Sequence, residues 1–200
     1  MITADPHSVP NLLREVTPLG DFYRRAGRPL PMVRFRSGVE LPEPYRSLLF
    51  HERDMTRTLE RFHGRSIHLR LLSSWKSGQD YGRECVLELE GDNQPVEFGA
   101  IWISLEAFPS EAQEQILAGH LPLGGILNQS GLAYTSRPTA FFEVEADEFI
   151  TCALHLRRPE VLYGRQNTLR SEGERVLAQI IEILPPASHE GFRDQKKDSS

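Results

Sequence analysis

Cysteine, lysine and long hydrophobic runs are scarce in this sequence of 200 residues. The two cysteines, Cys85 and Cys152, are too few for a disulfide framework, and we expect both to be reduced core residues in apolar, strand-like runs. No segment approaches the roughly 18 consecutive apolar residues of a membrane helix. The first residues lack the basic and apolar regions of a signal peptide. These absences predict a cytoplasmic protein that does not contact a membrane.

The common catalytic motifs are absent as well: there is no GxGxxG, P-loop, GxSxG or HExxH pattern. No two histidines lie three or four positions apart on a convincing helix, so we expect no metal site. Only three of the 23 basic residues are lysines, and none lies in an apolar setting that favours Schiff-base chemistry. The net charge of -5 argues against nucleic acid as a partner. We therefore expect a small-molecule partner and no cofactor.

The composition is that of one globular domain with extensions, since 39% of the residues are hydrophobic and 26% are charged. Residues 1–44 are rich in proline and glycine and are expected to form an N-terminal arm. Residues 45–186 carry the periodic patterns of the folded domain. The polar residues 187–200 are expected to be a disordered tail. Nothing in the pattern demands a partner chain, so we expect a monomer.

Hairpin turns join most of the predicted strands, without regular crossover helices between them. Asp54 and Gly64 are typical of the start and end of a helix, and Ser110 opens a capping box. Helices are expected in two pieces within 45–62, over 110–117 and from residue 122. Strands are expected over 67–72, 83–90, 96–103, 140–144, 149–156, 165–170 and 176–184. The pattern predicts an α+β fold with an antiparallel sheet of about six strands and helices packed on one face.

Arg83 breaks the pattern of its strand, because it alternates in phase with the apolar residues Cys85, Leu87 and Leu89. A cation at the end of a buried face either binds an anion there or extends to water. An internal ion pair with a carboxylate is a further alternative.

Glu182 raises a similar question in the last strand, where it alternates in phase with Ile180 and Leu184. A buried carboxylate needs a partner or its pKa rises, whereas on an edge strand it would face solvent. An inward arginine and an inward glutamate on one sheet would suit a small aromatic acid.

Two further features, the glycines after Leu123 and the methionine Met55, have both a functional and an ordinary structural interpretation. The glycines that follow Pro122 and Leu123 would let the backbone approach a ligand, although a plain helix start has the same composition. Met55 follows the expected helix cap Asp54, and a methionine there is more often a core residue.

Five segments in this order resemble the chorismate pyruvate-lyase family, the bacterial enzymes that make 4-hydroxybenzoate. The resemblance covers about residues 45–186. Its segments are LLFHERDMTRTLERF (48–62), GRECVLEL (82–89), LPLGGIL (121–127), LYGRQNTLR (162–170) and IIEILPP (180–186).

The resemblance implies a chorismate lyase-like fold and a cofactor-free lyase that converts chorismate to 4-hydroxybenzoate and pyruvate, usually for ubiquinone biosynthesis. It places substrate contacts at Met55, Arg83, Leu123 and Glu182. Arg83 would bind the ring carboxylate and Glu182 would face the ring hydroxyl, so both are the expected catalytic residues. With a different alignment gap, Ile180 would replace Glu182.

The second carboxylate of chorismate would need a second cation, for which Arg137 and Arg165 are the candidates. Two alternatives to this lyase remain open from the sequence. The same fold also resembles the ligand-sensing domain of some bacterial transcription regulators, which bind a small aromatic acid without converting it. A diverged lyase that acts on a related enolpyruvyl compound is the other alternative.

Overall fold

The computed structural model describes residues 16–187, and its centre is one antiparallel sheet of seven strands in the order β1-β5-β6-β7-β4-β3-β2. Residues 188–200 of the tail expected over 187–200, and the first 15 residues of the arm, lie outside the described residues. The boundaries proposed at residues 44 and 186 stay predictions. The strands are β1 (Val33–Arg36), β2 (Ile67–Ser77), β3 (Asp80–Leu89), β4 (Gln94–Ser104), β5 (Tyr134–Glu145), β6 (Val161–Ser171) and β7 (Val176–Leu184).

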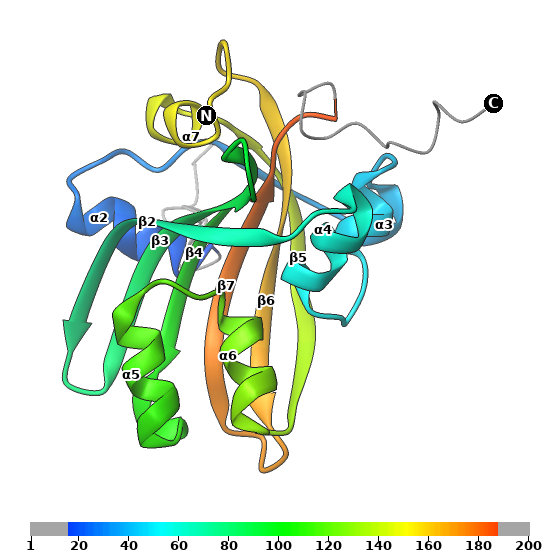
Figure 1. Cartoon of the computed structure of the whole chain (residues 1–200). Coiled ribbons are helices and arrows are strands. Elements are labelled where there is room, and N and C mark those ends of the chain that lie inside the picture. Colours follow the sequence, from blue (N-terminus) through cyan, green and yellow to red (C-terminus); the bar gives the residue numbers. More distant parts are fainter. Residues whose placement is uncertain (1–15, 188–200) are drawn as a thin grey trace, which may run out of the picture.

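Helices cover both faces of this sheet (Figure 1). On one face, α2 and α7 pack against Val86, Phe98 and Ile181. On the other face, α3 to α6 pack against residues of the opposite parity, such as Leu87 and Ile103. The helices are α2 (Leu19–Arg25), α3 (Tyr45–Leu49), α4 (Met55–His63), α5 (Ser110–Ala118), α6 (Leu123–Ser130) and α7 (Glu148–Ala153).

The α+β class and the antiparallel sheet are confirmed, and so are most helix ends. Helix α4 begins where expected, since a side-chain oxygen of Asp54 accepts a hydrogen bond from the Arg57 amide at 2.8 Å. It ends at Gly64, whose φ of 64° is the left-handed conformation typical of a helix C-terminus. The sequence placed helices on one face only, and the structure adds α2 and α7 on the other.

The strand expected over 149–156 is wrong, because most of this segment forms the helix α7. Its buried residues Ile150, Ala153 and Leu154 are three and four positions apart, which is helical spacing. The Asp147 side chain accepts a hydrogen bond from the Ile150 amide at 2.8 Å and so starts the helix. A short apolar run fits the period of a helix and that of a strand, and here the Asp147 cap favours the helix.

The expectation that both cysteines are core residues holds for Cys85 only, since Cys152 is exposed on α7. Part of the expected arm also belongs to the sheet. Strand β1 adds an edge to the sheet by pairing with β5. The Arg28 side chain binds both carboxylate oxygens of the buried Glu84, at 3.1 and 3.0 Å, on the face that α2 covers.

We expect Asp147→Ala to lower the free energy of unfolding by about 1 kcal/mol, because the first turn of α7 loses its cap. Urea denaturation measures this change. Glu148→Ala removes an exposed acidic residue of the same turn and should cost only about 0.3 kcal/mol. Equal losses in the two variants would contradict the capping role.

Candidate functional site

A cavity of about 70 Å³ lies between the sheet face that α3 to α6 cover and the first residues of α4 and α6. This volume is several times what one ordered water needs. The walls are mostly apolar, and charged side chains enter from β3, β4 and β7. The apolar lining residues include Leu69, Leu87, Ile101, Leu123, Leu169 and Ile180.

Arg83 lines this cavity with a side chain that is 1% exposed, so the guanidinium does not extend to water. Its Nη2 donates a hydrogen bond to the backbone oxygen of Leu121 at 3.0 Å. Its Nε and Nη1 have no hydrogen-bond partner among residues 16–187, and no carboxylate of that range forms an ion pair with it. The buried cation therefore retains donors for an anion.

Glu182 lies on the same sheet face and lines the same cavity, 4% exposed on a strand in the middle of the sheet. The edge-strand alternative is thereby excluded. One of its oxygens accepts a hydrogen bond from Nε of Arg165 on the neighbouring strand β6. The Glu182 carboxylate thus has a cationic partner within the protein.

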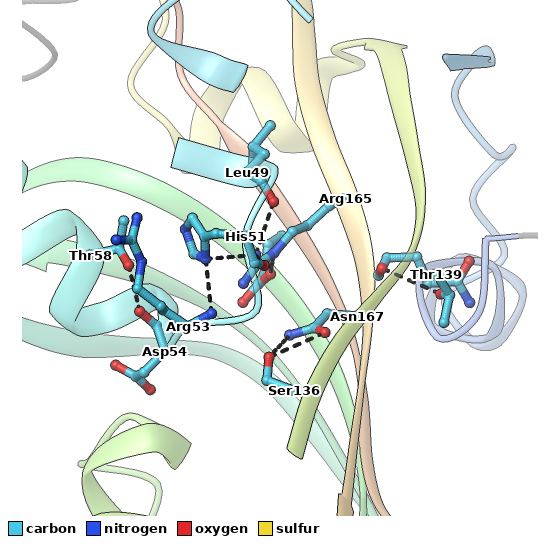
Figure 2. Close-up of polar contacts among 11 residues, drawn as sticks. Leu49, His51, Arg53, Asp54, Thr58, Ser136, Thr139, Arg165 and Asn167 are labelled. Carbon is cyan, nitrogen blue, oxygen red and sulfur yellow. Dashed lines mark hydrogen bonds and ion pairs between the residues drawn. The ribbon is translucent and has the colours of Figure 1, made fainter. Parts of the chain in front are cut away.

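Arg165 is fully buried and joins this ion pair to the end of α3 and the loop that follows it. Figure 2 shows its contacts with Leu49 and His51. Its Nη1 donates to the backbone oxygens of Leu49, at 3.0 Å, and His51, at 2.9 Å. Burial, with a smaller contribution from Arg165, lowers the pKa of His51 to about 4, so its imidazole is neutral at pH 7. This loop leads directly to Asp54 and Met55 at the cavity.

Met55 and Leu123 both line the cavity, at the starts of α4 and α6. The two helix starts adjoin each other, since a Cβ added to Gly124 would lie 1.7 Å from a carboxylate oxygen of Asp54. The amides of a first helical turn lack partners within the helix and favour negative charge. The Asp54 carboxylate already lies at both helix starts, so Met55 and Leu123 shape the cavity wall and the donors for an anion are those of Arg83.

Of the two candidates for a second cation, neither lines the cavity in the way the sequence suggested. Arg137 is exposed on β5, next to Ser136, which faces the cavity. Arg165 lies behind the cavity lining and neutralises Glu182. The structure thus brings together Met55, Arg83, Leu123 and Glu182, and leaves Arg137 apart.

Sequence reasoning missed Glu97 on β4, a carboxyl 5% exposed in the cavity lining. Its Oε2 has no hydrogen-bond partner in the described range 16–187. Burial, and next the negative charge of Glu182, raise the pKa of Glu97 well above its ordinary value. The available signal was its parity, which matches that of Ile101 and Ile103 on the same strand.

Gly99 forms part of the cavity floor between the charged groups, because it pairs with Cys85 on one side and with Glu182 on the other. A Cβ at this position would approach Sγ of Cys85 and Oε1 of Glu97 to 3.4 Å. The missing side chain keeps the floor open.

Two features are absent from residues 16–187. No group of three or more His, Cys, Asp or Glu side chains in this range is placed to hold a metal ion. No helix of the same range is long and apolar enough to cross a membrane.

No protein-family model matches the chain, and no curated protein matches it. Solved structures do resemble it. The effector domain of PhnF from Mycobacterium smegmatis has a TM-score of 0.55 at 12% identity, over 68% of this chain and 90% of that one. PhnF from the same organism has a TM-score of 0.52 at 13% identity, over 82% and 92%. A GntR-family transcriptional regulator from Bacillus cereus has a TM-score of 0.44 at 12% identity, over 62% and 94%.

These likenesses confirm the chorismate lyase-like fold and correct the expected activity. The expectation of an enzyme, a chorismate pyruvate-lyase, is wrong, because the fold match is to the effector domain of PhnF. No comparison supports lyase activity or a place in ubiquinone biosynthesis. No comparison supports the expected exclusion of nucleic acid as a partner. The cytoplasmic location and the monomeric state stay predictions.

We expect Arg165→Met to lower the free energy of unfolding by about 3–5 kcal/mol, because it leaves the Glu182 carboxylate buried without its cation. Urea denaturation measures the loss. The double variant Arg165→Met/Glu182→Met should recover a large part of it. A single variant as stable as the wild type would contradict the role of the pair.

We expect Glu97→Gln to be more stable than the wild type at pH 8. The ordinary pKa of a glutamate is 4.5, and that of Glu97 is raised in the folded state. Above pH 4.5 the unfolded chain ionises this group first, so the wild type loses stability as the pH rises towards the folded-state pKa. Glutamine removes this loss. Urea denaturation at pH 5, 6.5 and 8 measures the free energy of unfolding, with the exposed Glu148→Gln as control. The same pH dependence of this free energy in the wild type and in Glu97→Gln would contradict the prediction.

Proposed function

We propose that this domain binds a small carboxylic acid in the cavity and does not convert it. The carboxylate lies against Arg83, and the body of the ligand lies against the apolar walls. A binding domain of this kind agrees with the fold of the PhnF effector domain. The domain acts as a sensor, which signals by whether the ligand is bound.

The observation that carries this proposal is the buried guanidinium with two nitrogens, Nε and Nη1, that have no partner in residues 16–187. Leaving such donors without an acceptor costs about 1–3 kcal/mol, and more when the group is charged. A carboxylate can accept two parallel hydrogen bonds, one from Nε or Nη1 and one from the remaining hydrogen of Nη2, and so reduces this cost.

The walls set the shape of the ligand. Leucine and isoleucine side chains line the cavity, and Tyr134 from β5 supplies an aromatic ring. Apolar walls with a few convergent polar groups are typical of small-molecule sites. A compact ring or branched chain with one carboxylate meets these conditions, which is why an aromatic acid is the preferred class.

The absence of conversion is consistent with the state of Glu182 and with the cations that line the cavity. Glu182, expected to face a ring hydroxyl, is held by Arg165. No second cation lines the cavity opposite Arg83 in the described residues, apart from Arg53, which is exposed at its rim. A monocarboxylate therefore suits the charges better than a dianion such as chorismate.

We expect the wild type to bind benzoate, and Arg83→Met to bind it at least about tenfold more weakly, because a buried charge-assisted interaction is lost. Isothermal titration calorimetry measures the dissociation constants. Arg57→Met, which removes an exposed arginine of α4 outside the cavity lining, is the control and should bind as the wild type does. Incubation with chorismate should release no pyruvate. Equal affinities for wild type and Arg83→Met would contradict the proposal.

A second variant tests the cavity itself. Gly99→Val places a side chain on the floor between Cys85 and Glu97, and we expect it to abolish measurable benzoate binding while the protein stays folded. Calorimetry and urea denaturation of the same preparation check both statements. A folded Gly99→Val protein with unchanged affinity would place the ligand elsewhere.

A further inference from the structure

The two buried carboxyls of the cavity differ in how they are satisfied. Glu182 accepts a hydrogen bond from Arg165, so its charge is compensated by the protein. Glu97 has an oxygen, Oε2, without a partner in residues 16–187, although its side chain is 5% exposed. Of the two carboxyls, Glu97 is therefore the one left to meet a ligand.

Glu97 and Arg83 stand at opposite ends of the cavity floor. The register pairs Arg83 with Ile101 on β4, which is four residues from Glu97 on that strand. Four residues of extended strand correspond to about 13 Å between α-carbons. Gly99 lies midway between them and has no side chain to divide the space. One ligand can thus touch both groups.

The surroundings of Glu97 favour its neutral form. The charged and titratable groups facing it are Glu182 on β7, Asp54 at the start of α4, Arg165 on β6 and Cys85 on β3. Desolvation and the two acidic groups outweigh the arginine, which is already paired. A neutral carboxyl donates one hydrogen bond and accepts another.

A hydroxyl group has the same two capacities, so it can satisfy a neutral carboxyl completely. A second carboxylate at this end would meet the negative charges of Glu182 and Asp54. An ammonium group would require Glu97 to ionise in a buried site.

We propose that Glu97 selects the ligand by hydrogen bonding to a hydroxyl group, so that the domain binds hydroxy acids whose hydroxyl lies opposite the carboxylate. The proposal rests on the proposed function, since it assigns the second end of the same ligand. It makes Glu97 a specificity-determining residue of the cavity.

Four probes test it by titration calorimetry at pH 7: 4-hydroxybenzoate, its 3-isomer, 4-methylbenzoate and 4-(aminomethyl)benzoate. A methyl group replaces the hydroxyl at similar size. We expect the wild type to bind at least one hydroxybenzoate about fivefold or more tightly than 4-methylbenzoate. In Glu97→Leu this preference should disappear or reverse, while Arg83-dependent binding of 4-methylbenzoate persists. Glu97→Gln, which keeps a donor and an acceptor, should retain part of the preference.

The outcomes separate the two proposals. If no probe binds in an Arg83-dependent way, the proposed function fails and the role of Glu97 falls with it. If the probes bind through Arg83 but the wild type shows no hydroxyl preference, or Glu97→Leu retains it, only the role of Glu97 is overturned. Tightest binding of the aminomethyl compound overturns it too, since Glu97 would then act as a charged acceptor. Urea denaturation of both Glu97 variants establishes that each is folded.

Discussion

A buried guanidinium is the constraint on which the site depends. Arg83 lies on β3, between β4 and the edge strand β2, and its side chain is buried so that water cannot hydrate its charge. The protein supplies it with one acceptor, the backbone oxygen of Leu121. Its remaining donors face a cavity whose floor is opened by Gly99 and whose rim carries two helix starts. A buried cation left in this state is expected where an anion completes its hydrogen bonds.

The Arg165–Glu182 pair has a different task in the same region. It neutralises a carboxylate of the cavity lining. Through the backbone oxygens of Leu49, the last residue of α3, and His51 it also holds the segment that leads to Asp54 and Met55 (Figure 2). Because Arg165 already satisfies the Glu182 carboxylate, Glu97 is the carboxyl left to bind a polar group of the ligand at the end of the cavity opposite Arg83. The two glutamates lie on neighbouring strands, yet one stabilises the scaffold and the other is available to a ligand.

Local signals in the sequence predicted much of this arrangement. The cap Asp54, the terminator Gly64 and strict alternation located α4 and placed Arg83 and Glu182 on one face. Long-range pairing was beyond such signals: only the register of β6 with β7 brings Arg165 against Glu182. The apolar residues of the run 149–156 fit the helical and the strand period, so the sequence did not predict helix α7. Strand β1 was not predicted because it has only four residues and lies in a proline-rich arm. Glu97 had the right parity, but its missing partner is visible only in three dimensions.

The most direct test of this account is a crystal structure of the wild-type protein with 4-hydroxybenzoate. The account predicts unconverted ligand in the cavity, its carboxylate within hydrogen-bond distance of Nε or Nη of Arg83, and its hydroxyl directed towards Glu97. A ligand bound at the surface, or in the cavity with its carboxylate away from Arg83, would contradict the central claim that the buried guanidinium is the anion site.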